Sequence, residues 1–103
     1  MRAHWSKAYD WFNSNPENPE LLEAIDNING FYEGLGVFVK EGLIDIRLIA
    51  LTMTGATRAV WEKQAPYVVE ARETWGNPLF ASEFEYLYKE IMRYNQEHPN
   101  LHG

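Results

Sequence analysis

The chain has 103 residues, enough for one domain with one hydrophobic core, and apolar residues make up 46% of it, enough to fill that core. Its formal net charge of −6 at pH 7 disfavours nucleic acids and anionic membranes, because their phosphate groups would be repelled. The absence of cysteine excludes disulfides, thiolate metal sites and a cysteine nucleophile.

The first predicted element is a short helix over residues 2–13. Trp5, Tyr9 and Phe12 recur at intervals of four and three residues, which places them in one apolar stripe. The segment 13–16, Asn-Ser-Asn-Pro, then favours a turn, because these side chains bond the nearby backbone and Pro ends a helix.

The second predicted helix starts at Asn18-Pro19 and ends near Lys40 or Glu41. Asn is a strong N-cap, and Pro suits the first helical position because its missing N–H is not needed there. The apolar stripe of this helix alternates four and three residues throughout and comprises Leu21, Ile25, Ile28, Tyr32, Leu35 and Val39.

This helix also contains Gly30, Gly34 and Gly36, although interior Gly costs about 1 kcal/mol relative to Ala. At 100° per residue, Gly30 and Gly34 lie together with Val37, away from the main stripe. We therefore expect a second contact face formed by Gly30, Glu33, Gly34 and Val37. Either the first helix of the same chain or a second copy in a homodimer would cover it.

The segment Gly42-Leu43-Ile44-Asp45 predicts a tight corner between two helices. Gly42 suits the left-handed position just after a helix, and Leu43 would follow it in a Schellman end. Asp45 suits the next N-cap, and Ile44 and Ile49 have the spacing of a hydrophobic staple.

The third predicted helix runs from Asp45 to about Met53 and resumes through Val60 to Trp75. We expect it to be broken or kinked near Gly55 and near Pro66, because an interior Pro removes one hydrogen bond and clashes with the preceding turn. Gly76 is the expected C-cap.

The last predicted helix opens at Asn77-Pro78, the same signal as Asn18-Pro19, and ends at His98-Pro99. Its apolar stripe comprises Phe80, Phe84, Leu87, Ile91 and Tyr94. The fold class is therefore all-α, a bundle of four main helices in a single domain over residues 1–98, with 99–103 as a frayed tail.

No pattern in the chain predicts a catalytic, cofactor or metal site. His98 and His102 have metal-ligand spacing on a helix, but Pro99 lies between them and no third ligand is near. Glu33 is the most interesting carboxylate: we expect a solvated or rim position first, then a bridge to an Arg, and a catalytic role last. We expect no enzymatic activity.

Tyr32, Trp61 and Tyr67 offer an alternative, a small-ligand or sensor pocket lined by aromatic rings near Glu33. Aromatic residues at such spacing more often belong to a core. A ligand-binding function would require a cavity of a few hundred Å³.

A set of residues along most of the chain resembles a prokaryotic helical family of unknown function, whose members often carry membrane helices ahead of the domain. The resemblance covers roughly 19–94 and implies a fold but no reaction. It rests on Phe31-Tyr32-Glu33, Gly42-Leu43-Ile44-Asp45, Gly55, Trp61, Pro66-Tyr67, Arg72, Gly76-Asn77-Pro78 and Phe84.

The sequence as a whole predicts a small cytoplasmic interaction or scaffold domain that self-associates. The start of the chain has no apolar region of a secretory signal, and no apolar run approaches the roughly 20 residues that span a bilayer. We therefore expect a homodimer or a protein partner, no nucleic acid and no membrane insertion by this chain.

Overall fold

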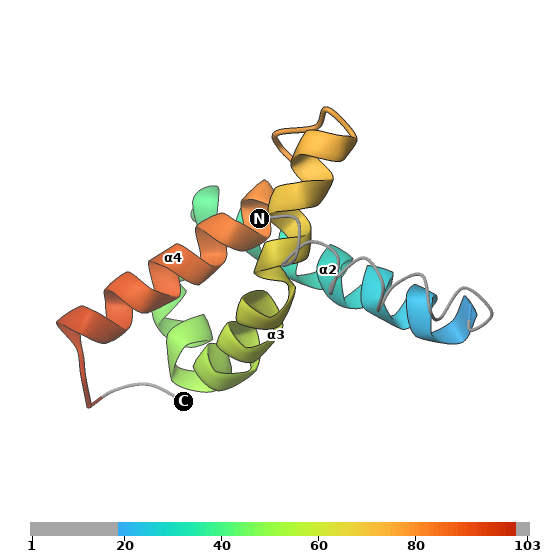
Figure 1. The fold of residues 1–103 in the computed structure, drawn as a ribbon. Helices are drawn as coiled ribbons and strands as arrows, with labels where there is room; N and C mark the ends of the chain where they lie inside the picture. Colours follow the sequence, from blue (N-terminus) through green and yellow to red (C-terminus); the bar gives the residue numbers. More distant parts are fainter. Residues whose placement is uncertain (1–18, 101–103) are drawn as a thin grey trace.

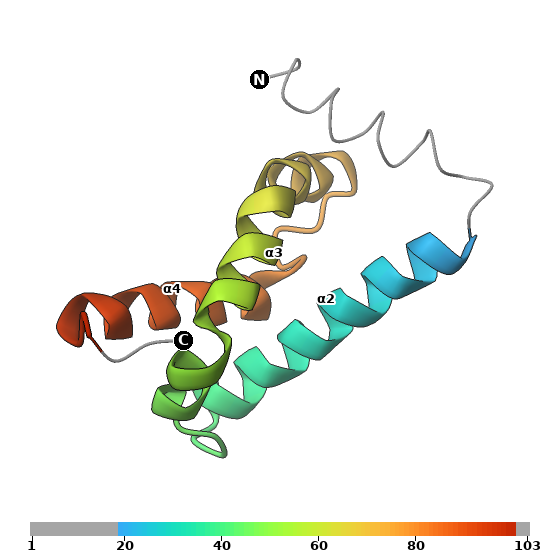
Figure 2. The same ribbon diagram turned by 90° about the horizontal axis from the view of Figure 1, so that it is seen from below.

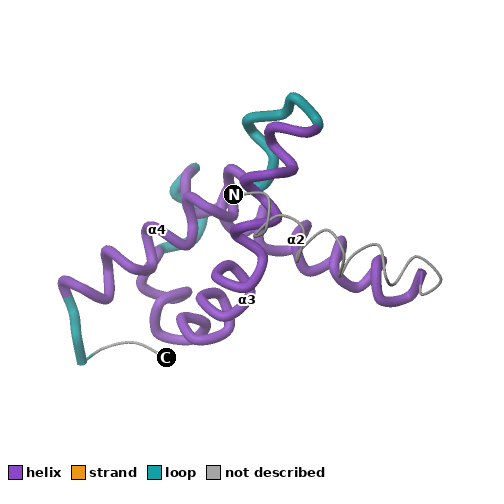
Figure 3. The backbone as a smooth tube through the Cα atoms, viewed as in Figure 1, coloured by secondary structure: helices purple, strands orange, loops and turns teal. Residues whose placement is uncertain are grey.

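The computed structural model describes residues 19–100, and these residues form three helices joined by two corners (Figure 1). The helices are α2 (Pro19–Lys40), α3 (Ile46–Thr74) and α4 (Ser82–Glu97). Residues 19–100 contain no strand (Figure 3), which confirms the all-α class. A bundle of four main helices is not confirmed, because the helix predicted over 2–13 lies outside the described residues.

The core lies where α4 packs against both of the other helices. Figure 2 shows α2 and α3 meeting at their shared corner and spreading apart from it, with α4 starting between them and running across α3. Phe84, Leu87 and Ile91 of α4 are fully buried. The buried core residues that surround them are Tyr32, Ile49, Trp61, Val68 and Ala81. The stripe predicted for α4 is therefore its buried face.

The corner over residues 41–45 has the predicted hydrogen bonds. Gly42 has φ of 77°, its N–H donates to the Val39 carbonyl at 3.1 Å, and the Leu43 N–H donates to the Phe38 carbonyl at 2.8 Å. These two bonds define a Schellman end. Asp45 then caps α3, because its Oδ1 accepts from the Arg47 N–H at 2.9 Å.

The interruption of α3 falls at Met53, where φ is −131° and ψ is 15°. This is two residues before Gly55. The Thr54 hydroxyl donates to the Ala50 carbonyl at 2.7 Å, a back-bond that commonly accompanies a bend in a helix. Pro66 lies inside α3, and the only non-helical backbone angles within that helix are at Met53. The kink predicted at Pro66 is therefore not confirmed.

The predicted start of the last helix, at Asn77-Pro78, is wrong. Gly76 ends α3 as expected, with φ of 62°, but Asn77 caps only a single turn: its Oδ1 accepts from the Leu79 N–H at 3.2 Å. Ala81 then adopts left-handed angles with φ of 58°, which stop that turn from growing into a helix. α4 begins at Ser82.

The apolar stripe of α2 is buried only in its second half. Tyr32 is buried and Leu35 and Val39 are half-buried against the core, whereas Ile28 is 43% exposed. The side chains of Leu21 and Ile25 lie outside the described set.

Candidate interaction surface

The second half of α2 is fastened to the first turn of α4 by close backbone contact. A Cβ built on Gly36 would collide with the Glu83 carbonyl group and would lie 2.7 Å from its carbon. Only Gly allows the two backbones to approach this closely. Of the three interior glycines of α2, Gly36 is therefore the one that internal packing explains.

Glu33 caps α4 from a distance. Its Oε1 accepts a hydrogen bond from the Phe84 N–H at 2.6 Å, and Phe84 lies in the first turn, whose N–H groups have no partner within the helix. Ala81, the residue at the N-cap, makes no side-chain cap bond. Glu33 is half-buried, a rim position, and its carboxylate accepts from a backbone N–H rather than from an Arg.

An ion pair adds to the same junction. The Lys40 ammonium pairs with the Glu83 carboxylate and lies 4.9 Å from the centroid of the Tyr86 ring. The hydrogen bond to Glu83 raises the pKa of Lys40 above its ordinary value. The end of α2 and the start of α4 thus form one rigid unit.

The opposite side of α2 exposes large apolar side chains. Phe31, Val37 and Phe38 are between 40% and 53% exposed. A Cβ on Gly30 or on Gly34 would meet nothing within 4 Å among the described residues. Gly30, Gly34 and Val37 of the predicted face are therefore on an open surface, and Glu33 lies at its border because its carboxylate turns to α4.

Phe31 and Phe38 are the residues of this surface that sequence reasoning missed. Both lie off the main stripe, and they are seven residues apart, which places them on one side of a helix. This seven-residue spacing is the feature of the sequence that could have identified them. Two interior glycines at about 1 kcal/mol each also remain without an explanation in the packing of α2 against the described residues.

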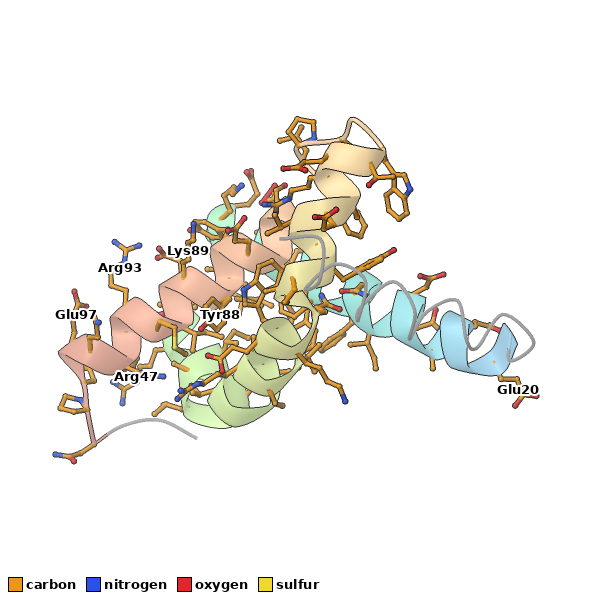
Figure 4. The ribbon with its side chains drawn as sticks, viewed as in Figure 1. Glu20, Arg47, Tyr88, Lys89, Arg93 and Glu97 are labelled. Atoms are coloured by element: carbon orange, nitrogen blue, oxygen red, sulfur yellow. The ribbon has the colours of Figure 1, made fainter. Side chains whose placement is uncertain are left out.

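The outer side of α4 provides a contrast, because it is charged. Figure 4 shows Lys89, Arg93 and Glu97 along this side. Lys89 pairs with Glu85 at 3.3 Å, and Arg93 pairs with Glu90. Charged side chains in such pairs are typical of a solvated helix face, whereas the open side of α2 carries exposed apolar side chains.

The three residues of the predicted ligand pocket are not brought together. Tyr32 stacks on Phe84 with centroids 4.4 Å apart, and Trp61 packs edge-on against the same ring at 5.1 Å. Phe84 thus fills the space between Tyr32 and Trp61, as in a core. Tyr67 belongs to a separate cluster with Trp75 and Phe80, where burial and the nearby Asp26 raise its pKa.

Two polar networks link α3 to α4. The Glu62 carboxylate accepts from the Tyr88 hydroxyl at 2.7 Å and from Arg58 at 3.0 Å, and these bonds lower the pKa of Glu62. Arg72 donates to the Phe80 carbonyl at 2.8 Å and to Glu85 at 2.9 Å. Both carboxylates are engaged in holding helices together.

Metal-binding geometry is not found in the part of the chain that the structure describes: residues 19–100 contain no group of three or more His, Cys, Asp or Glu side chains that could hold an ion. His98 stacks on Tyr94 with centroids 4.2 Å apart. His4 and His102 lie outside the described residues. None of the described helices could span a lipid bilayer, since each is too short or too polar.

The fold and this surface define a class of small all-helical domain with an apolar helix side that residues 19–100 leave open. The chain belongs to the family described as a domain of unknown function, DUF4760, whose match covers residues 2–91. This agrees with the family resemblance drawn from the sequence. No curated protein and no solved structure was found to match the chain.

Proposed function

We propose that this domain is a cytoplasmic protein-interaction module that self-associates through the open side of α2 and has no catalytic activity of its own. The observation that carries the proposal is the set of three exposed apolar side chains, Phe31, Val37 and Phe38, on a helix whose main apolar stripe is buried in its second half. Contiguous exposed apolar surface of this kind is typical of protein contact sites.

The rigidity of the junction with α4 supports this role. Gly36, Glu33 and Lys40 hold the second half of α2 in place. The exposed side is therefore presented on a fixed element, and little conformational freedom is lost when it binds.

The oligomeric state tests the proposal. Sedimentation equilibrium at micromolar concentration is expected to give twice the chain mass of 12.0 kDa. The double variant Phe31→Glu/Phe38→Glu is expected to weaken association at least roughly tenfold, because two charges would be buried in an apolar contact. The matched control is Leu48→Glu, which changes an exposed apolar residue of α3 and is expected to leave association unchanged.

A parent protein that stays at 12.0 kDa throughout the concentration series contradicts self-association. The absence of catalysis has its own test, an unbiased panel of hydrolase substrates. A turnover rate that is lost in Glu33→Gln would overturn that part of the proposal.

A further inference from the structure

We infer that two copies of this chain pair through α2 in antiparallel orientation, with the two-fold axis passing between Gly34 and Leu35. This inference rests on the proposed self-association and adds its geometry. The contact follows a seam, defined here as Asn27, Phe31, Gly34, Phe38 and Glu41, which alternates four and three residues along α2 and ends at the residue just after it. This alternation keeps one side of a helix facing a partner helix.

The sizes of the side chains along the seam are self-complementary in this arrangement. An antiparallel two-fold axis at the stated midpoint places Phe31 level with Phe38 of the second copy, and the converse, on the same edge of the contact. Aromatic pairs of this kind are favourable in edge-on or offset geometry. On the other edge, Gly30 lies about 3 Å along the axis from the level of Val37 of the second copy, so a small residue is close to a larger one.

Gly34 lies at the centre of the seam, where the two backbones would approach most closely. A Cβ at this position has open space within the described part of its own chain, so internal packing does not require Gly there. Close approach of a second helix does require it. Gly36, which faces α4, has no part in this contact.

The charges at the two ends of α2 select the antiparallel orientation. Exposed Glu20, Glu23 and Asp26 give the first end a charge of −3. At the second end, Lys40, Glu41, Asp45, Arg47 and Glu83, the ion-pair partner of Lys40, sum to −1. A parallel pair would place −3 beside −3, whereas an antiparallel pair places −3 beside −1. Figure 4 shows Glu20 and Arg47 on opposite sides of the molecule.

Cysteine cross-linking tests the orientation, since the chain has no native cysteine. Asn27→Cys and Glu41→Cys are made as separate full-length variants, one of them tagged, and oxidised alone or mixed. In the antiparallel pair, two copies of position 27 lie about 22 Å apart along the axis, beyond the reach of a disulfide. Position 27 of one copy lies within about 1.5 Å, along the axis, of the level of position 41 of the other.

The expected result is a cross-linked heterodimer in the mixture, roughly tenfold above the homodimer that either variant forms alone. Ala59→Cys, at an exposed site on α3, is the control and is expected to remain uncross-linked. A dimer that cross-links through Asn27→Cys alone is parallel, and a dimer that cross-links at neither site uses another surface. Both results overturn the inference and leave self-association standing.

A protein that remains monomeric overturns the inference and the proposed self-association together.

Discussion

The two corners of this chain begin alike and are completed differently. The first begins at Gly42 and the second at Gly76, both with left-handed angles. At the first corner, Asp45 caps the next helix three residues later with its own side chain. At the second, α4 starts only at Ser82, and no local side chain caps it.

The second corner is completed by residues from elsewhere in the chain. Glu33, 51 residues before Phe84, supplies the missing cap, and Arg72 holds the Phe80 carbonyl and the Glu85 carboxylate. A corner built from adjacent residues depends only on its own sequence, whereas this one depends on the docking of α2. Substitutions in α2 should therefore damage the second corner and spare the first.

The largest effect is expected for Gly36→Ala. The added methyl group collides with the Glu83 backbone and pushes Glu33 away from the start of α4, so we expect a loss of about 2–3 kcal/mol of stability. Thermal unfolding followed by circular dichroism measures it. Gly34→Ala, at a protein concentration low enough to keep the chain monomeric, is the control and is expected to be neutral or stabilising because Ala favours a helix.

Gly42→Val tests the first corner, with an expected loss of more than about 1 kcal/mol, because a β-branched residue is strained at a φ of 77°. Urea unfolding gives the value. A melting temperature within about two degrees of the parent would show that the left-handed angle at Gly42 is not required.

Glu33→Ala is expected to cost about 1–2 kcal/mol, the usual effect of losing a helix cap. Glu33→Gln keeps an acceptor oxygen on the same stem, so its loss should be smaller. Combined with Asp45→Ala in a double-mutant cycle, the two effects should add, since the caps belong to separate corners. A strong coupling between them would show that the two corners are not independent.

The smallest effect concerns the pH dependence at the second corner. Burial alone would raise the pKa of Glu85, but hydrogen bonds and charges of Arg72 and Lys89 hold it below 4.5. A lowered folded-state pKa stabilises the protein above the unfolded value and loses that contribution as pH falls. Glu85→Gln should therefore flatten the loss of stability below about pH 4.5 by a few tenths of a kcal/mol.

Urea unfolding at pH 3, 4, 5 and 7 measures this dependence. Glu73→Gln, an exposed carboxylate of the last turn of α3, is the control and should follow the parent. If Glu85→Gln leaves the acid dependence of the unfolding free energy unchanged, the pairing of Arg72 with Glu85 does not stabilise the second corner.

The difference between the corners also explains what the sequence could predict. Gly42 and Asp45 act on residues within five positions of themselves, and the predicted corner is confirmed down to its hydrogen bonds. Asn77-Pro78 has the pattern of a helix start, but Ala81 interrupts it, and nothing in the local sequence indicates that Glu33 replaces the cap. The position of Glu33 at the start of α4 depends on the docking of α2 against α4.

The sequence predicted only part of the candidate surface, because the rest depends on how the helices dock. Helical spacing placed Gly30, Gly34 and Val37 on one side of α2, and the described residues, 19–100, leave that side open. Spacing could not show that Gly36 alone meets α4, since this depends on where α4 crosses. The pocket of Tyr32, Trp61 and Tyr67 could not be excluded until Phe84 was seen between the first two rings.

The remote cap of α4 also bears on the order of folding. Closing the first corner brings together residues close in sequence, which costs little loop entropy, whereas the contact of Glu33 with Phe84 closes a loop of 51 residues. We expect α2 and α3 to be paired at the folding transition state, with high φ-values at Gly42 and Asp45. Glu33 should show a φ-value near zero, so that its loss accelerates unfolding and leaves the folding rate unchanged.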